Sequence, residues 1–255
     1  MRTNIVKQKL SSGEPCRGIW LGLPDSFSVR LLAQLPLDWL LIDAEHAPVD
    51  ALTLSQMVAA MSGPGNPAPF VRVADASVEN MKRALDAGAF GVIAPMINNR
   101  KEAEQVVMWS RYPPLGQRSF GNAYAGLAFG TSMGEYLRFA NEQTVLGIQI
   151  ESREALGNLD EIFSVPGIDM VFVGPVDLSV SLGLEPLPEN QHPIFLEALA
   201  EIKARAKQHK LPLGIYCSNG ASARMRIEEG FQFVNVTSDI GSLTKHAVRE
   251  LDASF

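Results

Sequence analysis

Eight short runs of apolar, often β-branched residues recur along the chain, and each is followed by a stretch with helical patterning. Most runs are continuously apolar, which is typical of strands buried on both faces of a parallel sheet. The predicted strands are 18–22, 38–43, 69–73, 90–96, 145–151, 169–174, 212–217 and 233–238. Eight strands that alternate with helices over 255 residues predict a (β/α)8 TIM barrel in preference to an open doubly wound sheet. We expect residues 1–255 to form one barrel domain.

The segments between the strands supply the helices. The clearest is 77–87, because Ser77 can cap its start and Gly88 can end it. The other predicted helices are 26–34, 50–61, 100–110, 193–209, 220–229 and 241–251. An extra helix over 3–12 is expected to plug one end of the barrel.

Two connections are too long for simple crossovers between a strand and a helix. Residues 112–143 are rich in glycine and aromatic residues, and 178–192 form a second excursion. Connections of this length in a compact domain usually carry function or subunit contacts.

Charge and composition exclude several kinds of partner. The 22 lysines and arginines against 28 acidic residues give a net charge of −6 without a basic cluster, so we expect no nucleic-acid or anionic-membrane binding. No apolar run approaches the ~18 residues of a membrane span, and the first residues lack the apolar block of a signal peptide. Cys16 and Cys217 share no metal or redox spacing, so the expected location is a reducing cytoplasm.

Polar residues gather where the predicted strands end. They are Asp43, Glu45 and His46 after the second strand, Arg72 in the third, Gln149 and Glu151 in the fifth, and Asp177 after the sixth. In a barrel the carboxyl ends of the strands meet at one rim, where active sites lie. We therefore expect these side chains to share one site.

Glu151 and Asp177 come from consecutive strands, so two carboxylates can face one point. Two carboxylates with waters and a chelating substrate suit a hard cation such as Mg²⁺ or Mn²⁺. The alternative is that they cap the following helices or pair with Arg153. Gln149, two residues before Glu151 on the same strand face, favours the metal site.

His46 stands beside two acidic residues at a strand end, which suits a general base because its ordinary pKa lies near neutrality. The alternative is a structural histidine that holds a loop. His192, His209 and His246 fall in a loop or on helices, and we expect them to be surface or packing residues.

Arg72 lies inside an apolar run, where a permanent charge is costly unless it is paired. It can form a buried ion pair with Asp43 or Glu45. It can also hold a carboxylate or a developing enolate oxygen. The two hypotheses are compatible.

Imine chemistry is disfavoured by the placement of the lysines. A Schiff-base aldolase needs a lysine at the barrel mouth. All eight lysines of the chain fall on predicted helices or at their ends. No nucleotide-binding glycine motif follows a strand, and the turns at 218–220 and 238–242 are only weak phosphate-site signals.

Several motifs together resemble one enzyme family. They are DAEH (43–46), LDAG (85–88), RYPPLGQRS (111–119), QIE (149–151) and GPVDLS (174–179). With these motifs, the sequence resembles the metal-dependent (class II) pyruvate aldolases, the family of 4-hydroxy-2-oxoheptanedioate and 2-keto-3-deoxy-sugar-acid aldolases. The similarity covers nearly the whole chain.

The resemblance implies a carbon–carbon lyase that reversibly cleaves 4-hydroxy-2-oxo acids to pyruvate, or a close 2-oxo acid, and an aldehyde. It implies that Glu151 and Asp177 hold a divalent cation (Mg, Mn or Co). Gln149, with the backbone around Val176 and Asp177, binds the pyruvate moiety. A homohexamer that exchanges its last helix between subunits is the expected assembly.

For catalysis, the resemblance implies that His46 is the base and that Arg72 stabilises the enolate, with Asp43 of the DAEH motif among the catalytic residues. It also assigns Asp86 the role of raising the basicity of the histidine. Asp86 lies near the carboxyl end of a predicted helix, which places it toward the opposite rim. Two departures from the family pattern, Ser119 and Tyr216, are expected on the aldehyde side of the site.

Two other hypotheses compete with the aldolase. A citrate-lyase-like enzyme that cleaves a coenzyme A thioester would favour basic residues around the rim, and none cluster there. A non-catalytic barrel that binds small 2-oxo acids would not need the metal pair, His46 and Arg72 together.

Overall fold

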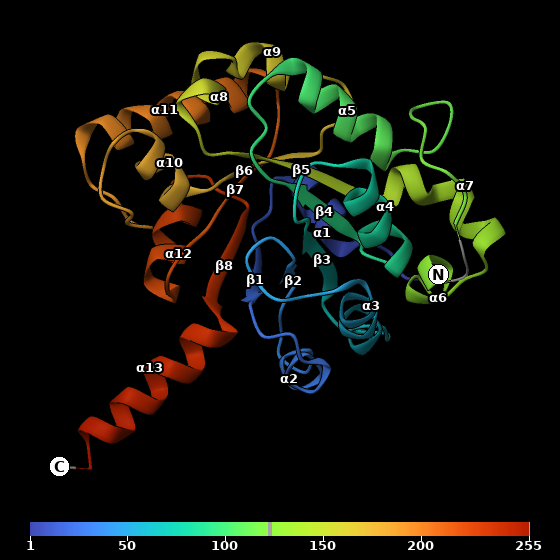
Figure 1. Cartoon of the computed structure of the whole chain (residues 1–255), viewed down its shortest axis with the longest axis horizontal. Coiled ribbons are helices and arrows are strands. Elements are labelled where there is room, and N and C mark those ends of the chain that lie inside the picture. The colour runs from blue at the N-terminus through green and yellow to red at the C-terminus, as the bar shows by residue number, and fades with distance from the viewer. Residues whose placement is uncertain (122–123, 255) are drawn as a thin grey trace.

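Eight parallel strands close into a barrel in the computed structural model, which describes residues 1–121 and 124–254 (Figure 1). Each strand pairs with its neighbours in sequence, and the eighth closes onto the first. The strands are β1 Cys16–Leu21, β2 Trp39–Asp43, β3 Ala68–Arg72, β4 Gly91–Ala94, β5 Val145–Ile150, β6 Met170–Val173, β7 Leu213–Ile215 and β8 Phe233–Ser238. Every strand overlaps its predicted range, so the (β/α)8 barrel is confirmed.

Aromatic rings fill the barrel interior. Trp39 stacks on Phe233 with ring centroids 4.0 Å apart, and Phe70 lies 5.1 Å from Phe233. A Cβ on Gly18 or Gly91 would lie 2.1 Å from a ring atom of Trp39 or Phe70. These two positions are therefore glycine because the rings occupy the space, and the interior is a packed core.

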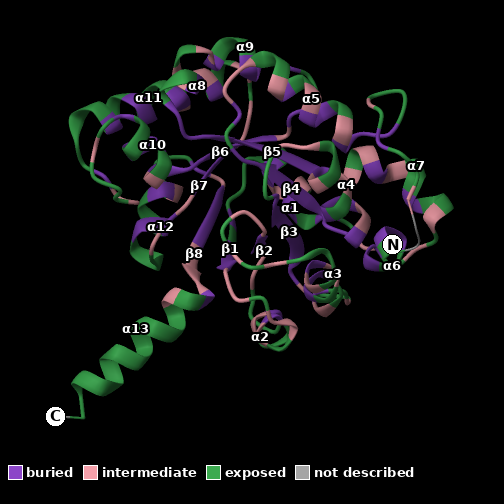
Figure 2. Cartoon of the chain, in the orientation of Figure 1, coloured by how far each residue is buried: buried purple, intermediate pink, exposed green. Residues whose placement is uncertain are grey.

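Helices cover the outside of the barrel and turn their buried residues toward it (Figure 2). Those that match the predicted ranges are α2 Ser26–Leu32, α3 Ala51–Ala60, α4 Val78–Ala87, α5 Arg100–Ser110, α11 Pro193–Gln208 and α12 Gly220–Glu228. In α4, Ser77 caps the first turn and Gly88 ends the helix with a φ of 102°, as the sequence predicts.

The predicted extra helix is α1 (Ile5–Ser12), and it closes the amino-terminal end of the barrel. Its Val6 and Leu10 are buried in the core. The side-chain amide of Asn4 donates hydrogen bonds to the carbonyls of Phe90 (2.9 Å) and Gln143 (2.7 Å), which precede β4 and β5. This helix therefore seals the end opposite the rim where the strands finish.

The long connection 112–143 contains two helices that the sequence analysis did not predict, α6 (Tyr124–Ala128) and α7 (Met133–Gln143). The prediction of a long connection between a strand and a helix was therefore correct but left out these helices. Ser132 and Glu135 form a reciprocal capping box that starts α7, because each side chain accepts from the other's backbone.

The second long connection, 178–192, begins within a short helix, α10 (Pro175–Ser181), and is irregular beyond it. Two more unpredicted short helices, α8 (Arg153–Gly157) and α9 (Leu159–Phe163), join β5 to β6. Short helices of this kind follow the strand ends closely, so α8 and α10 begin at the rim.

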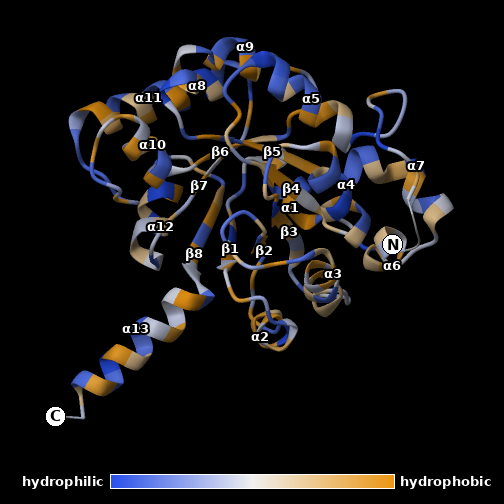
Figure 3. Cartoon of the chain, viewed as in Figure 1, coloured by the Kyte–Doolittle hydropathy of each residue, from blue (hydrophilic) through white to orange (hydrophobic). Residues whose placement is uncertain are grey.

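The last helix, α13 (Asp239–Asp252), projects away from the barrel (Figures 1 and 2). Only Asp239 among its residues is buried. Apolar residues recur along it between polar ones (Figure 3), and the exposed large ones are Ile240, Leu243, Val248 and Leu251. Within the two described ranges, no helix is both long and apolar enough to cross a bilayer.

Candidate active site

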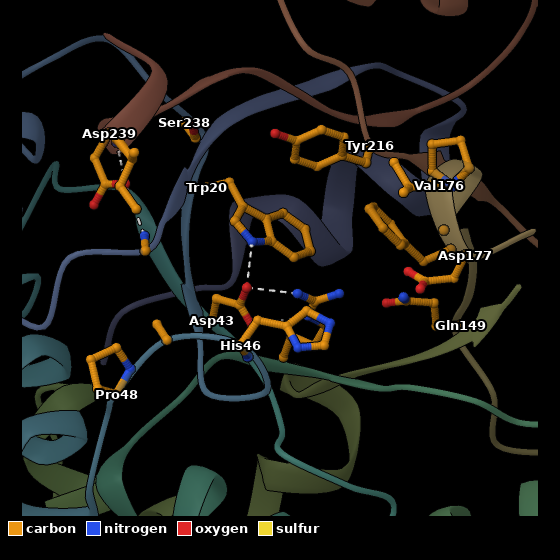
Figure 4. A pocket seen from close by; sticks show the side chains of 17 residues that line it. Trp20, Asp43, His46, Pro48, Gln149, Val176, Asp177, Tyr216, Ser238 and Asp239 are labelled. Carbon is orange, nitrogen blue, oxygen red and sulfur yellow. Dashed lines mark hydrogen bonds and ion pairs between the residues drawn. The ribbon is translucent and has the colours of Figure 1, made fainter. Parts of the chain in front are cut away.

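A cavity of about 590 Å³ opens where the strands end (Figure 4). The strand-end side chains that line it are Trp20, Asp43, Arg72, Gln149, Phe172, Tyr216 and Ser238, from β1, β2, β3, β5, β6, the end of β7 and β8. His46, Val176 and Asp177 line it from the following turns. Polar residues scattered along the sequence thus meet at one rim, as predicted.

Arg72 is almost fully buried and makes both of the predicted ion pairs. Its Nε and Nη2 lie 3.1 and 2.6 Å from the two carboxylate oxygens of Asp43, and its Nη1 lies 3.1 Å from Glu45 Oε2. A guanidinium carries five N–H donors, and those on Nε and Nη2 form the hydrogen bonds to Asp43. The contact with Glu45 is an ion pair without a hydrogen bond, so the N–H groups of Nη1 remain for a ligand. The ion-pair role is therefore present, and the role of anion holder is compatible with it.

Asp43 is the hub of this network. Besides Arg72, it accepts from Trp20 Nε1 at 3.1 Å and from the backbone N–H groups of Glu45 (3.1 Å) and His46 (3.2 Å). Burial alone would raise the pKa of Asp43, but the hydrogen bonds and charge of Arg72 outweigh it and hold the pKa below its ordinary value. Asp43 thus stays ionised, orients Arg72 and fixes the turn that carries His46.

Glu151 is buried just beyond the end of β5, beside the cavity-lining residues Gln149 and Gly174. Its Oε1 accepts the Met96 N–H at 2.8 Å, and its Oε2 contacts Gln149 Nε2 closely. Burial raises the pKa of Glu151 to about 7, against the hydrogen bonds from Gln149 and Met96 and with help from the charge of Asp177. The raised pKa means that the surroundings do not fully compensate a negative charge on Glu151.

Two backbone features hold Glu151 in place. Met96 adopts a left-handed φ of 53°, unusual for a residue with a side chain, and this turns its N–H toward the carboxylate. At Gly174, an added Cβ would lie 2.2 Å from Glu151 Oε2, so only glycine fits beside it.

The residues present fit a hard cation. Asp177 lies in the first turn of α10, and its charge acts on Glu151. Gln149 Oε1 is a buried acceptor with no hydrogen-bond partner among the described residues. Those residues contain no cluster of three or more His, Cys, Asp or Glu side chains that encloses an ion. Two carboxylates suit a cation such as Mg²⁺, which keeps water and substrate oxygens as its other ligands.

The alternative roles of Glu151 are not what the structure shows. Ser152 Oγ caps α8 by accepting from the Ala155 N–H at 3.0 Å. Arg153 donates to the Leu182 carbonyl at 3.2 Å, and no ion pair joins it to Glu151 or Asp177 among the described residues.

His46 stands at the mouth of the cavity with 63% of its side chain exposed. Its Nε2 lies 3.9 Å from Glu45 Oε2. His192 caps α11, His209 lies 3.2 Å from Asp160 Oδ1, and His246 is on the exposed face of α13. None of these three lines the cavity, which agrees with the surface or packing roles expected for them.

Two predicted site residues do not line the cavity, Glu151, which is buried beside Gln149, and Asp86, which lies apart from the site. Asp86 lies near the carboxyl end of α4, where its Oδ1 accepts from the fully buried Arg118 at 2.9 Å. The helix position predicted this location toward the other rim. Within one chain, Asp86 therefore makes its contacts apart from His46.

Comparison with known proteins agrees with this geometry. Residues 17–246 match the model of the HpcH/HpaI aldolase/citrate lyase family. The chain belongs to this family. It is 40% identical to a hydroxypyruvate/pyruvate aldolase of Rhizorhabdus wittichii, with 96% of each chain covered. It is also 40% identical to a 4-hydroxy-2-oxo-heptane-1,7-dioate aldolase of Salmonella typhimurium, over 96% of this chain and 92% of that one.

A crystal structure of an HpcH/HpaI aldolase/citrate lyase family protein from Burkholderia cenocepacia superposes with a TM-score of 0.90 and 33% identity, covering 99% of both chains. The family name spans aldolases and citrate lyases, and the relatives at 40% identity are aldolases. The protein is therefore a carbon–carbon lyase of the HpcH/HpaI family, and the aldolase interpretation fits better than the citrate-lyase or non-catalytic ones.

Trp20 belongs to this HpcH/HpaI site and was not singled out from the sequence. It lies in the predicted apolar strand 18–22, yet its indole N–H holds Asp43 and its ring lies 4.8 Å from the Arg72 guanidinium carbon. Glu45 was expected at this rim and as an ion-pair partner of Arg72, and it contacts both Arg72 (3.1 Å) and His46 (3.9 Å). The available signal for Trp20 was its indole N–H, a polar group on a residue near the end of a predicted strand.

Proposed function

We propose that the protein is a divalent-metal-dependent aldolase that reversibly cleaves 4-hydroxy-2-oxo acids into pyruvate, or a close 2-oxo acid, and an aldehyde. The observation that supports this most is one cavity lined by Asp177 and Arg72, with the Glu151 carboxylate buried directly beside its lining residues Gln149 and Gly174. All eight lysines lie in the described ranges and none lines the cavity, so a Schiff base has no candidate residue.

Enzymes of this family depend on a divalent cation, and we propose Glu151 and Asp177 as its protein ligands. When bound, the cation supplies a Lewis acid that makes the C3 protons of a 2-oxo acid removable near neutral pH. Mg²⁺, Mn²⁺ and Co²⁺ are the proposed candidates, because the ligand atoms are oxygens. Gln149 and the backbone at Val176 and Asp177 orient the 2-oxo acid beside these ligands.

Arg72 donates N–H groups of its Nη1 to the oxygen on which negative charge develops. The donors are aimed before the substrate arrives, because Asp43, Glu45 and Trp20 already fix the guanidinium plane. No reorganisation of the arginine is then needed during the reaction.

His46 is the proposed base that takes the C3 proton of pyruvate, and in cleavage the proton of the 4-hydroxyl group. Its exposure at the cavity mouth lets it exchange that proton with water. For Asp86 we propose only the role that the family resemblance implies, support of His46 as a base. A pH–rate profile that is the same in Asp86→Asn and the wild type would contradict that role.

Pyruvate release from a panel of 4-hydroxy-2-oxo acids, measured with and without divalent metal, tests the function. Activity should disappear with chelator and return with Mg²⁺, Mn²⁺ or Co²⁺. Borohydride trapping of pyruvate on the protein would instead show an imine mechanism. Cleavage of a coenzyme A thioester, without release of pyruvate from the panel, would support the citrate-lyase alternative.

We also propose a homo-oligomer, expected to be a hexamer, in which residues 1–255 act as one aldolase domain in the cytoplasm. The exposed apolar residues of α13 support the assembly, because the helix buries almost nothing on its own barrel. Light scattering at micromolar concentration tests it. A mass near the 27.7 kDa of one chain would contradict the oligomer.

A further inference from the structure

We infer that Asn235 is a positioning residue of this active site: its side-chain amide places Tyr216 in the cavity wall and so sets how the substrate beyond its pyruvate portion is held. The inference rests on the proposed function, because the reaction it concerns is that cleavage. Asn235 lies in β8, is fully buried and does not line the cavity. It therefore acts through other residues.

The strand β8 is irregular directly after Asn235. Its pairing with β1 is regular up to Asn235 and then skips Val236, which is one extra residue in β8. The skip brings Ser238 opposite Trp20 in β1. A bulge of this kind re-aims the side chains that follow it, and bulges are common next to active sites.

The neighbouring strand β7 ends at the same level. It has only three residues, and its last pair with β8 joins Ile215 to Val234. Beyond that pair, Asn235 Oδ1 accepts from the Cys217 N–H at 2.8 Å, and Asn235 Nδ2 donates to the Cys217 carbonyl at 2.6 Å. Nδ2 also donates to the Thr237 carbonyl, across the bulge, at 3.4 Å. A carboxamide has the donor and the acceptor of a peptide group, so it replaces the backbone pairing that ends here.

Fixing Cys217 also fixes the residue before it. Tyr216 lines the cavity, and its ring packs edge-on against Trp20 with ring centroids 5.5 Å apart (Figure 4). The hydroxyl groups of Tyr216 and Ser238 hydrogen-bond each other. Asn235 thus supports both partners of this bond, because it holds the end of β7 through Cys217 and spans the bulge that precedes Ser238.

The side chains of Trp20, Tyr216 and Ser238 form one hydrogen-bonded and packed wall of the cavity. None of the three is a proposed metal or pyruvate ligand. With the 2-oxo acid held at Gln149 and Asp177, the substrate beyond C3 is left to the rest of the cavity lining, to which the wall belongs. The backbone of Tyr216 has little support of its own, since its N–H donates to the Val173 carbonyl only at 3.4 Å.

Cleavage of 4-hydroxy-2-oxopentanoate by the full-length protein with Mg²⁺ tests the inference. The C3–C4 bond breaks, the 4-hydroxyl group loses its proton and C3 gains one, so pyruvate and acetaldehyde form without net oxidation or reduction. We expect Asn235→Ala to lower kcat/KM about tenfold, because a misplacement of about 1 Å near the reacting groups can cost up to 10²-fold. Exchange of the pyruvate C3 protons in D₂O, which involves no aldehyde, should stay within about twofold of the wild type.

A double-mutant cycle shows whether Asn235 acts through Tyr216. In a Tyr216→Ala background the positioned side chain is already absent, so Asn235→Ala should then change kcat/KM less than about twofold. Asn235→Ser keeps a polar group in the buried site and should fold even where Asn235→Ala does not. Its single hydroxyl cannot make both bonds to Cys217, and it should show the same selective fall in cleavage.

Asn4→Ala is the matched control for lost stability. Asn4 is also fully buried, and its amide donates to two backbone carbonyls at the opposite end of the barrel. This variant should melt below the wild type, as the Asn235 variants do, and keep the wild-type kcat/KM. Equal falls in cleavage and exchange for the Asn235 variants, or a full fall in the Tyr216→Ala background, would overturn the inference.

The wild-type protein separates the inference from the proposed function. If it shows neither metal-dependent C3 exchange nor cleavage of a 4-hydroxy-2-oxo acid, the proposed function fails. If it shows both and the Asn235 variants behave like Asn4→Ala, only the role of Asn235 is wrong.

Discussion

The two ends of the barrel both contain buried charge, and they handle it in opposite ways. At the amino-terminal end, Asp169 accepts from Arg111, Lys7 and the Leu146 N–H, so its carboxylate is saturated by the chain. At the carboxyl end, Glu151 has a raised pKa and Arg72 keeps N–H donors that form no hydrogen bond to Glu45. The first arrangement stabilises the fold, and the second leaves interactions for a ligand to complete.

Asp177→Ala should have the largest effect of these variants on activity. We expect loss of metal binding and a fall in kcat of at least about 10³-fold, because the electron sink is lost. The barrel should remain folded, since a carboxylate in a wet site contributes little to the core. Calorimetric titration with Mn²⁺ and pyruvate release measure the two losses. A Tm more than ~10 °C below the wild type in chelator would assign the residue a structural role instead.

Arg72→Lys should have the second largest effect on kcat. If the planar fork holds the developing oxyanion, a flexible point charge cannot replace it, and kcat should fall roughly 10²–10³-fold, about 3–4 kcal/mol. Metal affinity should stay nearly unchanged, and C3 proton exchange should fall together with aldol cleavage. NMR in D₂O measures the exchange without an aldehyde. Wild-type exchange in this variant would limit Arg72 to balancing Asp43 and Glu45.

At the amino-terminal end of the barrel, Asp169→Asn should lower the stability of the fold and leave the activity nearly unchanged. It leaves Arg111 buried without its anion, at a cost of about 3 kcal/mol in the free energy of unfolding. Urea denaturation measures this loss, and kcat should remain close to the wild-type value. A large fall in kcat with unchanged stability would mean that the two ends are not functionally separate.

The smallest predicted effect is a pH dependence of stability that comes from Glu151. Its folded-state pKa of about 7 exceeds the ordinary value of 4.5, so between these pH values the folded state holds a proton that the unfolded state has lost. The free energy of unfolding without metal should therefore fall as the pH rises through this window, by at most about 3 kcal/mol.

Thermal melts in chelator from pH 4.5 to 8.5 check this slope. Glu151→Gln should flatten it, and a saturating divalent cation should offset it in the wild type. Equal slopes for Glu151→Gln and the wild type in chelator would show that another group is responsible.

The sequence was sufficient for features that follow from periodicity and topology. Continuous apolar runs predicted every strand, and parallel closure then placed Arg72, Gln149 and Asp177 at one rim. The helix position of Asp86 also predicted its distance from the cavity. Helices α6 and α7 were missed because their segment is rich in glycine and aromatic residues, and α7 depends on a local capping box.

Other features depend on long-range geometry that no local pattern encodes. The φ of Met96 is set by the carboxylate that its N–H meets 55 residues later in the chain. The role of Trp20 depends on Asp43, which only the β1–β2 pairing brings within 3.1 Å. An apolar strand residue gives no sign in the sequence of where its one polar atom points.

Gly174 has a consequence for how this protein can evolve. Every other amino acid has a Cβ, which at this position would lie 2.2 Å from Glu151 Oε2. No substitution of Gly174 alone therefore keeps the Glu151 carboxylate where it is. Gly174 should therefore be retained in every descendant that uses Glu151, whatever changes occur elsewhere in the cavity. A descendant that has lost this glycine has therefore moved or abandoned the carboxylate beside it, and a codon-level mutational scan should find this position among the least tolerant in the chain.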